Sequence, residues 1–304
     1  DRVQDLGRGG RGVVDRVIDR HLEREVAIKR IGSGSQHGSG TIDREVQQRF
    51  LHEAKITSQL QHPGVVPVHE LGTGPHGEAY YVMKLLEGDT LRQLIRTQHA
   101  PSRTPGHRWT PHTLRQAINP LLDRFIDVCN ALAYAHKQGV IHRDLKPANV
   151  MVGAFGETIV VDWGLAKRFA GSTNDDCQRA ETTPRTEDAM QRDADHAVQL
   201  CEAAFREVPR SNPSRSEKGS ESGQHTTQGT IVGTPAYMSP EQAKGDVENL
   251  RPASDIYALG VMLYEMVAGQ HPYRDLDLLA ILQHIREAKW KPLGSVQPTV
   301  PKAL

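Results

Sequence analysis

The feature that most restricts how this 304-residue chain can fold is a cluster of charged side chains between two short hydrophobic runs. Residues 142–149 read HRDLKPAN, and thirteen residues after Asn149 comes the triplet DWG, which begins at Asp162. Asp144 can accept the proton of an attacking hydroxyl group, while Asn149 and Asp162 can reach a metal ion bound to phosphates. Phosphoryl transfer depends on such positioning and charge neutralisation more than on covalent chemistry. The cluster therefore predicts a site for phosphate chemistry.

A glycine-rich segment near the N-terminus fits the pattern G-x-G-x-x-G-x-V, with Gly7, Gly9, Gly12 and Val14 at the fixed positions. Glycine lets a backbone approach phosphate oxygens closely and adopt dihedral angles that other residues avoid. The pattern alone is weak evidence, because a dinucleotide-binding turn has similar spacing but passes directly into a helix. Here β-forming residues follow, so we expect a hairpin that folds over phosphates.

A lysine and a glutamate further along can supply the ion pair that a phosphate site needs. Lys29 ends the strand-like run VAIK. Glu53 lies within residues 43–60, where apolar side chains at near-helical spacing predict a helix. A lysine that holds two phosphates needs a carboxylate to fix its rotamer, and a helix can deliver or withdraw that carboxylate. Taken alone, Lys29 would be interpreted as a solvated edge residue.

The remaining hydrophobic patterns predict a small β-rich part followed by a larger helical part. Further strands are expected at residues 65–71, 79–85, 141–152 and 158–161. Helical patterns dominate from residue 91, and a long amphipathic helix should end near Gly139. A helix at 253–268 is apolar on nearly all sides, which predicts a central buried position. The expected fold class is therefore α+β, with one main helix in the first part.

Composition narrows the possible functions and surroundings. Lys+Arg and Asp+Glu both number 37, so the chain lacks the basic excess of a nucleic-acid binder and no nucleic-acid partner is expected. No apolar run approaches the length of a membrane span, so no membrane segment is expected within this chain. The three cysteines are too few and too widely spaced for a disulfide framework. A cytoplasmic location is therefore expected.

Residues 168–229 differ from the segments around them. They are rich in Ser, Thr, Arg, Glu and Asp and poor in large apolar residues, which is typical of a disordered insertion. Within them, apolar residues between Ala194 and Val208 form a stripe at helical spacing, and Thr186 could cap such a helix. We expect most of this insertion to be mobile, with the stripe as a possible exception.

The motifs together resemble the protein kinase superfamily over essentially the whole chain, and the chain looks closest to bacterial Ser/Thr kinases of the eukaryotic-like type. Residues 233–243 (GTPAYMSPEQA) are similar to the end of their activation segment, and residues 254–260 (SDIYALG) to the start of their central helix. The resemblance implies a bilobal kinase fold with a small β-rich N-lobe and a larger, mostly helical C-lobe. It places the N-lobe at 1–83, the hinge at 84–88 and the C-lobe at 89–304.

The resemblance also implies roles in catalysis. Lys29 and Glu53 would form the ion pair that positions ATP, and Asp144 would be the catalytic base. Lys146 would neutralise the γ-phosphate, and Thr234 would form a hydrogen bond near Asp144. Lys146 within the catalytic loop is similar to the Ser/Thr-specific pattern and not to the tyrosine-specific one.

Metal and nucleotide contacts follow from the same resemblance, with ATP and Mg²⁺ (or Mn²⁺) as the implied substrate and cofactor. Asn149 and Asp162 would be the metal ligands, and Asp255 would brace the backbone of the catalytic loop. The nucleotide would contact Gly7, Gly9, Gly12, Val14, Ala27, Met83 as the gatekeeper, Leu86 in the hinge and Met151.

Three positions depart from the family pattern. Trp163 replaces the usual Phe of the D-F-G triplet, but the flanking Asp162 and Gly164 are intact, so activity is expected. Ser239 replaces the Ala of A-P-E. Ala148 stands where some kinases carry a Glu that recognises basic substrate residues, so no preference for arginine is expected through that position.

Two other functions compete with an active protein kinase. A pseudokinase that acts as a scaffold or binding module would account for Trp163 and the insertion, although no catalytic residue is missing. A small-molecule kinase with this fold is disfavoured by residues 233–241, which build a platform for protein substrates in the family. Protein substrates are therefore the expected partners, and Thr226, Thr227 or Thr230 the expected sites of regulatory autophosphorylation.

The end of the sequence implies a longer protein. The resemblance would place an arginine partner for Glu241 beyond residue 304, so we expect the chain to be a fragment. Leu282 and Ile285 are then expected to lose part of their cover. Whether the longer protein carries a membrane anchor or a sensor domain is left open.

Overall fold

The computed structural model describes residues 2–9, 12–31, 36–37, 41–42, 44–75, 77–103, 108–169, 235–246 and 249–300. The predicted helical stripe between Ala194 and Val208 lies outside them, as do Thr226, Thr227, Thr230 and Thr234. Within the described part, no helix combines the length and the apolar character that crossing a membrane requires.

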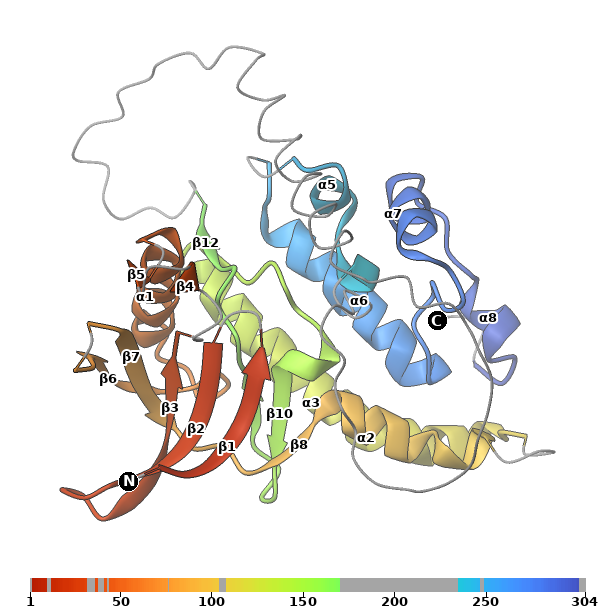
Figure 1. The fold of residues 1–304 in the computed structure, drawn as a ribbon. Helices are drawn as coiled ribbons and strands as arrows, with labels where there is room; N and C mark the ends of the chain where they lie inside the picture. Colours follow the sequence, from red (N-terminus) through yellow and green to blue (C-terminus); the bar gives the residue numbers. More distant parts are fainter. Residues whose placement is uncertain are drawn as a thin grey trace, which may run out of the picture.

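The N-terminal part is built on an antiparallel sheet of five strands in the order β1-β2-β3-β7-β6 (Figure 1). The strands are β1 (Arg2–Gly9), β2 (Gly12–Asp19), β3 (Arg24–Arg30), β6 (Val68–Thr73) and β7 (Ala79–Lys84), and a separate short pair joins β4 (Gln36–His37) to β5 (Thr41–Ile42). The predicted strand at 65–71 is displaced, because Val65 instead makes a parallel bridge to Val160 in the C-terminal part. That bridge ties the two parts together.

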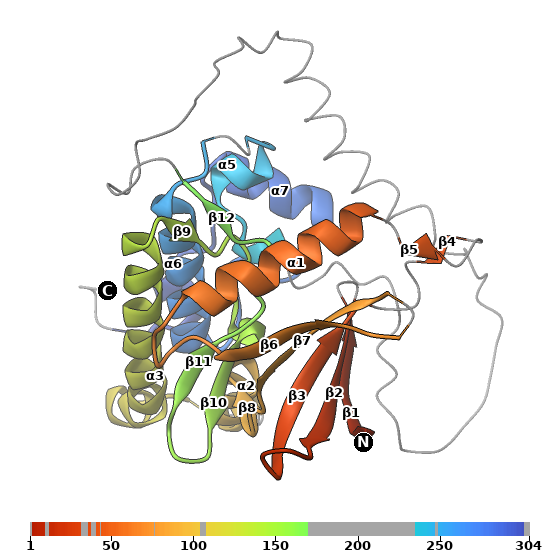
Figure 2. The same cartoon turned by 90° about the vertical axis from the view of Figure 1, so that its left-hand side faces the viewer.

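The helix predicted at 43–60 is α1 (Arg44–Gln59). Phe50 and Ala54 on one face of this helix are buried in a cluster with Ala79 and Tyr81 of β7. Phe50 and Ala54, one turn apart, thus pack α1 against the sheet. Glu53 lies between them in the sequence. Figure 2 shows α1 running above the strands and toward the second part of the molecule.

The C-terminal part is mostly helical and, among the described residues, carries two small sheets. Its helices are α2 (Leu91–Gln98), α3 (Pro111–Lys137), α5 (Pro240–Ala243), α6 (Pro252–Ala268), α7 (Leu278–Arg286) and α8 (Leu293–Val296), with the 3-10 helices η2 (Ala100–Arg103), η3 (Pro147–Asn149) and η4 (Pro235–Tyr237). Its strands are β8 (Gly88–Thr90), β9 (Val140–Ile141), β10 (Val150–Gly153), β11 (Thr158–Val160) and β12 (Lys167–Arg168). The α+β fold class predicted from the sequence is confirmed by this architecture and by the family match reported below.

The short strands set the boundaries of the catalytic motifs. The order β11-β10-β8 places β10 at the centre of a small antiparallel sheet, directly after η3. β12 pairs with β9, and Arg168 donates a hydrogen bond of 2.6 Å to Gln59 at the end of α1. Arg168 therefore belongs to the folded frame, so the predicted boundary of the insertion at residue 168 is too early.

The prediction of a central buried position for α6 holds for one face of this helix only. Met262 and Met266 are fully buried in the main core cluster, together with Leu121 and Val128 of α3. Ile256, in contrast, is 61% exposed. The buried positions of α6 recur every three or four residues, which marks one face of a helix. An apolar side chain such as Ile256 can lie on the opposite face without being covered.

The expectation that Ile285 loses its cover is also wrong. Its side chain is 0% exposed and belongs to the main core cluster, against which Leu282 packs as a partly buried residue. α7 achieves this burial by packing against α5 and η4. Cover for Ile285 therefore comes from elements within the described residues.

Candidate active site

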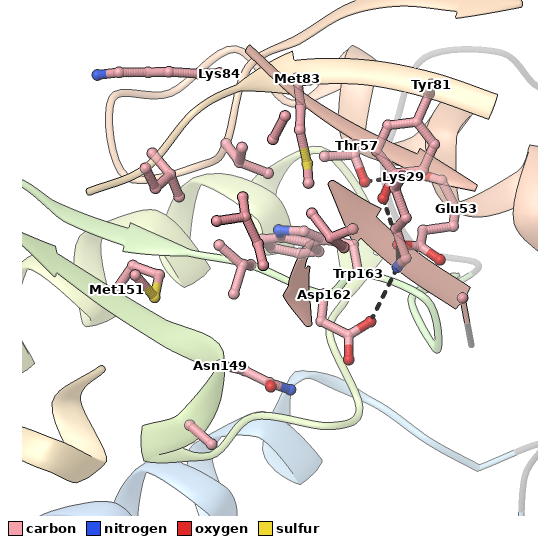
Figure 3. A pocket seen from close by; sticks show the side chains of 18 of the residues that line it. Lys29, Glu53, Thr57, Tyr81, Met83, Lys84, Asn149, Met151, Asp162 and Trp163 are labelled. Atoms are coloured by element: carbon pink, nitrogen blue, oxygen red, sulfur yellow. Dashed lines mark hydrogen bonds and ion pairs between the residues drawn. The ribbon is translucent and has the colours of Figure 1, made fainter. Parts of the chain in front are cut away.

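A cavity of about 860 Å³ opens between the two parts of the molecule, and it is lined by side chains from both (Figure 3). Twelve of the residues predicted from the sequence lie along it: Gly12, Val14, Ala27, Lys29, Glu53, Met83, Leu86, Asp144, Lys146, Asn149, Met151 and Asp162. Apolar members gather on one side and charged members on the other, which matches the two halves of a nucleotide. Leu6 and Val66 also line the cavity, and sequence reasoning did not single them out.

The described residues of the glycine-rich segment end β1 and begin β2. Gly7 pairs with Val14 and Gly9 pairs with Gly12 in the antiparallel register, so Gly12 begins β2 at the end of the hairpin. Gly12 has a φ of 141°, and a Cβ atom there would lie 2.4 Å from the carbonyl oxygen of Arg30. Any larger residue would clash with β3, so this position requires glycine.

Three charged side chains meet at the polar end of the cavity. The Nζ atom of Lys29 lies 2.5 Å from Oε1 of Glu53 and 3.8 Å from Oδ1 of Asp162. The side chains of Lys29 and Glu53 are only 10% and 4% exposed. Buried charges are costly unless they are paired, so the pairing fixes both rotamers. Lys29 is thereby held with its ammonium group facing the cavity (Figure 3).

Tyr81 is a further polar member of this group that sequence reasoning missed. Its hydroxyl donates a hydrogen bond of 2.8 Å to Oε1 of Glu53, and its side chain is buried. Burial and the adjacent Glu53 carboxylate raise the pKa of Tyr81 far above its usual value, so the hydroxyl keeps its proton and remains a donor. Sequence patterns did not identify Tyr81, because the register that sets it opposite Lys29 is a property of the folded sheet.

The catalytic loop brings Asp144, Lys146 and Asn149 together. Lys146 Nζ lies 2.9 Å from Oδ2 of Asp144. Asn149 Nδ2 donates to the main-chain oxygen of Asp144 at 2.9 Å and lies 3.4 Å from its Oδ2. The Asp144 carboxylate thus has a fixed orientation at the cavity. The 3-10 helix η3 produces this arrangement, because it folds the chain back between Lys146 and β10.

Asp255 at the start of α6 braces the same loop from below. One oxygen accepts a hydrogen bond from the backbone N–H of His142 at 2.8 Å, and the other accepts from that of Arg143 at 2.9 Å. His136 Nε2 lies 2.8 Å from the first oxygen. Arg143 has a φ of 71°, a backbone state that costs energy in a non-glycine residue and needs such support.

The ionisation of Asp255 reflects these contacts. Burial by itself would raise the pKa of this carboxyl. The hydrogen bonds from His136 and from the two backbone N–H groups outweigh that effect, and the pKa of Asp255 lies below its usual value of 3.8. Asp255 is therefore a buried anion that is stabilised by hydrogen bonds from the loop backbone and from His136.

Trp163 occupies the floor of the cavity. It is 1% exposed, and its Nε1–H donates a hydrogen bond of 3.3 Å to the carbonyl oxygen of Val160. Its ring lies 4.6 Å from the ring of His142, measured between centroids. A large aromatic side chain thus fits in place of the usual Phe without entering the polar end of the cavity. Asp162 beside it has a φ of 61°, which turns its carboxylate toward Lys29.

The segment after Thr234 is anchored to the catalytic loop. Gln242 Nε2 donates a hydrogen bond of 2.6 Å to the main-chain oxygen of Arg143. Ser239 caps α5 by accepting from the N–H of Gln242, which gives a structural reason for serine at this position. Glu241 accepts a hydrogen bond of 2.5 Å from the hydroxyl of Ser254. The loop and the platform after it thus form one connected unit.

Two residues along the cavity could bind a magnesium ion together with the phosphates of a substrate. The carboxylate of Asp162 and the amide of Asn149 supply the oxygen ligands that Mg²⁺ prefers, and Mg²⁺ usually binds through one or two carboxylates plus substrate phosphates. Among the described residues, no group of three or more His, Cys, Asp or Glu side chains could hold a metal ion by itself.

Comparisons with known proteins agree with this geometry. The sequence profile described as "Protein kinase domain" matches residues 1–186 and 216–301. The chain is 33% identical over 304 residues to a protein of Protochlamydia amoebophila named serine/threonine-protein kinase PknD, and 34% identical over 276 residues to the protein of that name in Chlamydia trachomatis serovar D. These matches cover 99% and 88% of this chain but only 26% and 24% of the two relatives. The chain thus spans about a quarter of the length of these proteins.

Proposed function

The chain belongs to the protein kinase family as a catalytic domain of the bacterial eukaryotic-like Ser/Thr type, and we propose that it transfers the γ-phosphate of ATP to serine or threonine hydroxyl groups of proteins. One observation carries the proposal. The Lys29–Glu53 pair, the Asp162 carboxylate and the Asp144 carboxylate all line a single cavity between the two parts of the chain. Acceptor activation and phosphate positioning can therefore occur at one place.

The apolar side of the cavity would hold the adenine ring. Val14 and Ala27 from the N-terminal sheet and Met151 from β10 line that side. Met83 lies near the end of β7, and Leu86 lies on the connection from β7 to β8, where backbone groups can pair with the edge of a base. Lys29 would then hold the phosphates, because its ammonium group is already fixed by Glu53.

At the reacting centre, the acceptor hydroxyl oxygen attacks the γ-phosphorus while its proton passes to the carboxylate of Asp144. A phosphorus–oxygen bond forms to the acceptor, and the bond to the oxygen bridging the β- and γ-phosphates breaks, which leaves ADP. Lys146, at 2.9 Å from Asp144, neutralises charge on the transferring group. Asp162 and Asn149 would hold Mg²⁺, which supplies charge neutralisation between the phosphates when bound.

The relatives and the residues at the site support Ser/Thr specificity. Both relatives described above bear the name serine/threonine-protein kinase. Lys146, two residues after the catalytic Asp144, is similar to the pattern of Ser/Thr-specific kinases. The anchored segment at 235–243 supplies a platform next to the catalytic loop, which favours a protein substrate over a small molecule.

Phosphate transfer to a general protein substrate, measured with and without Mg²⁺, tests this function. We expect Mg²⁺-dependent transfer of labelled phosphate from ATP, no transfer by Asp144→Ala, and phosphoserine or phosphothreonine in mass-spectrometric site mapping. A chain that binds a nucleotide but transfers no phosphate would support the alternative function of a pseudokinase scaffold. Phosphotyrosine as the main product would contradict the proposed specificity.

We further propose that phosphorylation of Thr226, Thr227 or Thr230 regulates this activity. Burial lowers the pKa of the Arg143 guanidinium, although the adjacent Asp255 opposes that shift. The buried Nε atom of Arg143 has no hydrogen-bond partner among the described residues. A phosphate adds about −1.5 to −2 charges and strong acceptor oxygens, so it could pair with Arg143 and align the catalytic loop.

A triple alanine variant at Thr226, Thr227 and Thr230, assayed beside phosphatase-treated and untreated protein, tests this regulation. We expect low activity in the variant and in the treated protein. Full activity in both would show that the catalytic loop is aligned without a phosphate at these threonines.

A further inference from the structure

Tyr81 and Lys29 form a pair of donors for a single acceptor atom. Both reach Oε1 of Glu53, with Lys29 Nζ at 2.5 Å and the Tyr81 hydroxyl at 2.8 Å. The two donors stand opposite each other in the register of β3 and β7, so their side chains project from the same face of the sheet. Figure 3 shows both side chains directed at Glu53 from the sheet side.

Tyr81 also touches α1 at a second point. Its ring lies 5.2 Å from that of Phe50, measured between centroids, and both side chains are buried. Phe50 precedes Glu53 by three residues and so lies on the same side of the helix. Tyr81 therefore holds α1 by an apolar contact through its ring and by a polar contact through its hydroxyl.

The Tyr81 hydroxyl interacts with the charge of the Glu53 carboxylate, which the packing of the Tyr81 ring does not. A carboxylate can accept several hydrogen bonds, and a buried carboxylate with few donors is free to rotate toward another partner or toward water. Glu53 is 4% exposed. Lys29 must divide its charge between Glu53 and the phosphates of a bound nucleotide, and Tyr81 supplies a contact with Glu53 that the nucleotide does not compete for.

We propose that Tyr81 is a positioning residue for phosphoryl transfer, which fixes the Glu53 carboxylate so that Lys29 remains aimed at the nucleotide phosphates. This inference rests on the proposed kinase function. It predicts that the Tyr81 hydroxyl, and not only its ring, contributes to the binding of the phosphate groups.

Tyr81→Phe is the sharpest test, because it removes the hydroxyl and keeps the ring that packs on Phe50. Tyr80→Phe is a matched control, since Tyr80 is the neighbouring residue on β7 and its side chain points to the opposite face, over Gly72. A hydrogen bond to a charged group typically corresponds to about a tenfold change in an equilibrium constant. We expect the affinity for a Mg²⁺-bound, non-hydrolysable ATP analogue to fall about tenfold in Tyr81→Phe and to stay unchanged in Tyr80→Phe.

The loss should depend on the phosphates and on Glu53. Adenosine, which has no phosphates, should bind Tyr81→Phe as it binds the unmodified protein. In a Glu53→Ala background, where the acceptor is gone, Tyr81→Phe should cause almost no further loss, because the two changes remove the same interaction. Thermal unfolding of each variant identifies any loss that reflects a damaged fold.

Equal analogue affinity for Tyr81→Phe and the unmodified protein would overturn the inference. A loss that is the same for adenosine, or one that persists in full in the Glu53→Ala background, would also overturn it and leave Tyr81 with a packing role only. These measurements use binding, so they remain decisive even if the chain transfers no phosphate and the proposed catalytic function fails.

Discussion

Asp162 is proposed to act on the nucleotide and is not part of the hydrophobic core, so its removal should separate activity from stability. We expect Asp162→Ala to lower phosphate transfer by at least about 10²–10³-fold, because a well-placed charge is lost at the centre of charge development. Asp162 is 31% exposed, so the fold should survive. Circular dichroism and thermal unfolding provide the control, and near-normal turnover would rule out the assigned metal role.

Lys29→Met should also reduce phosphate transfer, but at a cost in stability that Asp162→Ala lacks. Methionine keeps most of the side-chain volume but removes the ammonium group, so Glu53 is left buried without its cation. We expect transfer to be abolished, together with weaker binding of the ATP analogue and a lower melting temperature than that of Asp162→Ala. Unchanged analogue binding by Lys29→Met would contradict its contact with the phosphates.

Substitutions of Trp163 test whether a tryptophan in the triplet at residues 162–164 is compatible with activity. Replacing a fully buried tryptophan by alanine costs about 3–5 kcal/mol of stability, so Trp163→Ala should unfold at a much lower temperature. Trp163→Phe loses the hydrogen bond to Val160 but keeps an aromatic ring beside His142. We expect it to retain activity, with a smaller loss of stability. A large gain in activity on Trp163→Phe would mean that the tryptophan blocks catalysis.

At the scale of the element, α6 supports the catalytic loop through one side chain. The pKa of Asp255 is lower in the folded protein than its usual value of 3.8. Ionised Asp255 therefore stabilises the fold fully at pH values above 3.8, and this stabilisation is lost as the pH falls through the pKa of the folded state. Asp255→Asn lacks that titration. We therefore expect Asp255→Asn to be less stable at neutral pH and to show a weaker loss of stability on acidification below about pH 4.

Chemical denaturation at a series of pH values measures both effects. Parallel curves of unfolding free energy against pH for the two proteins would show that Asp255 does not titrate as proposed. Activity of Asp255→Asn should fall as well, because the positive φ of Arg143 depends on the hydrogen bond that Asp255 accepts.

At the scale of the whole molecule, the boundary of the insertion can be tested by deletion. Arg168 pairs in β12 and contacts Gln59, so a deletion should start after Phe169, whose backbone N–H donates to Gly139. We expect a variant without residues 170–229 to keep both parts folded, because this segment is poor in core-forming residues and the family profile does not match 187–215. Thermal unfolding and analogue binding measure the outcome, and a collapse of both would show that the segment is integral to the fold.

Local sequence was sufficient for the parts of the site that lie close together along the chain. Asp144, Lys146 and Asn149 are separated by a few residues, so the turn that joins them also sets their distances. The same is true of the glycines at the β1–β2 turn, where the spacing in the sequence is the spacing in the hairpin. The presence of α1 followed from its helical periodicity, because an amphipathic helix must bury one face.

Only the tertiary structure shows which residues far apart in the sequence contact each other. The Tyr81 hydroxyl donates to Glu53 because β7 and α1 pack at one angle and one register. The contact of Asp255 with the backbone of residues 142 and 143 was implied by the family resemblance and not by any local pattern. Exposure was decided by packing as well: Ile256 lies open and Ile285 lies buried, although both are isoleucines within apolar helical patterns. Hydrophobic periodicity predicts that one face of a helix is buried, but only the packed chain determines which residues are buried.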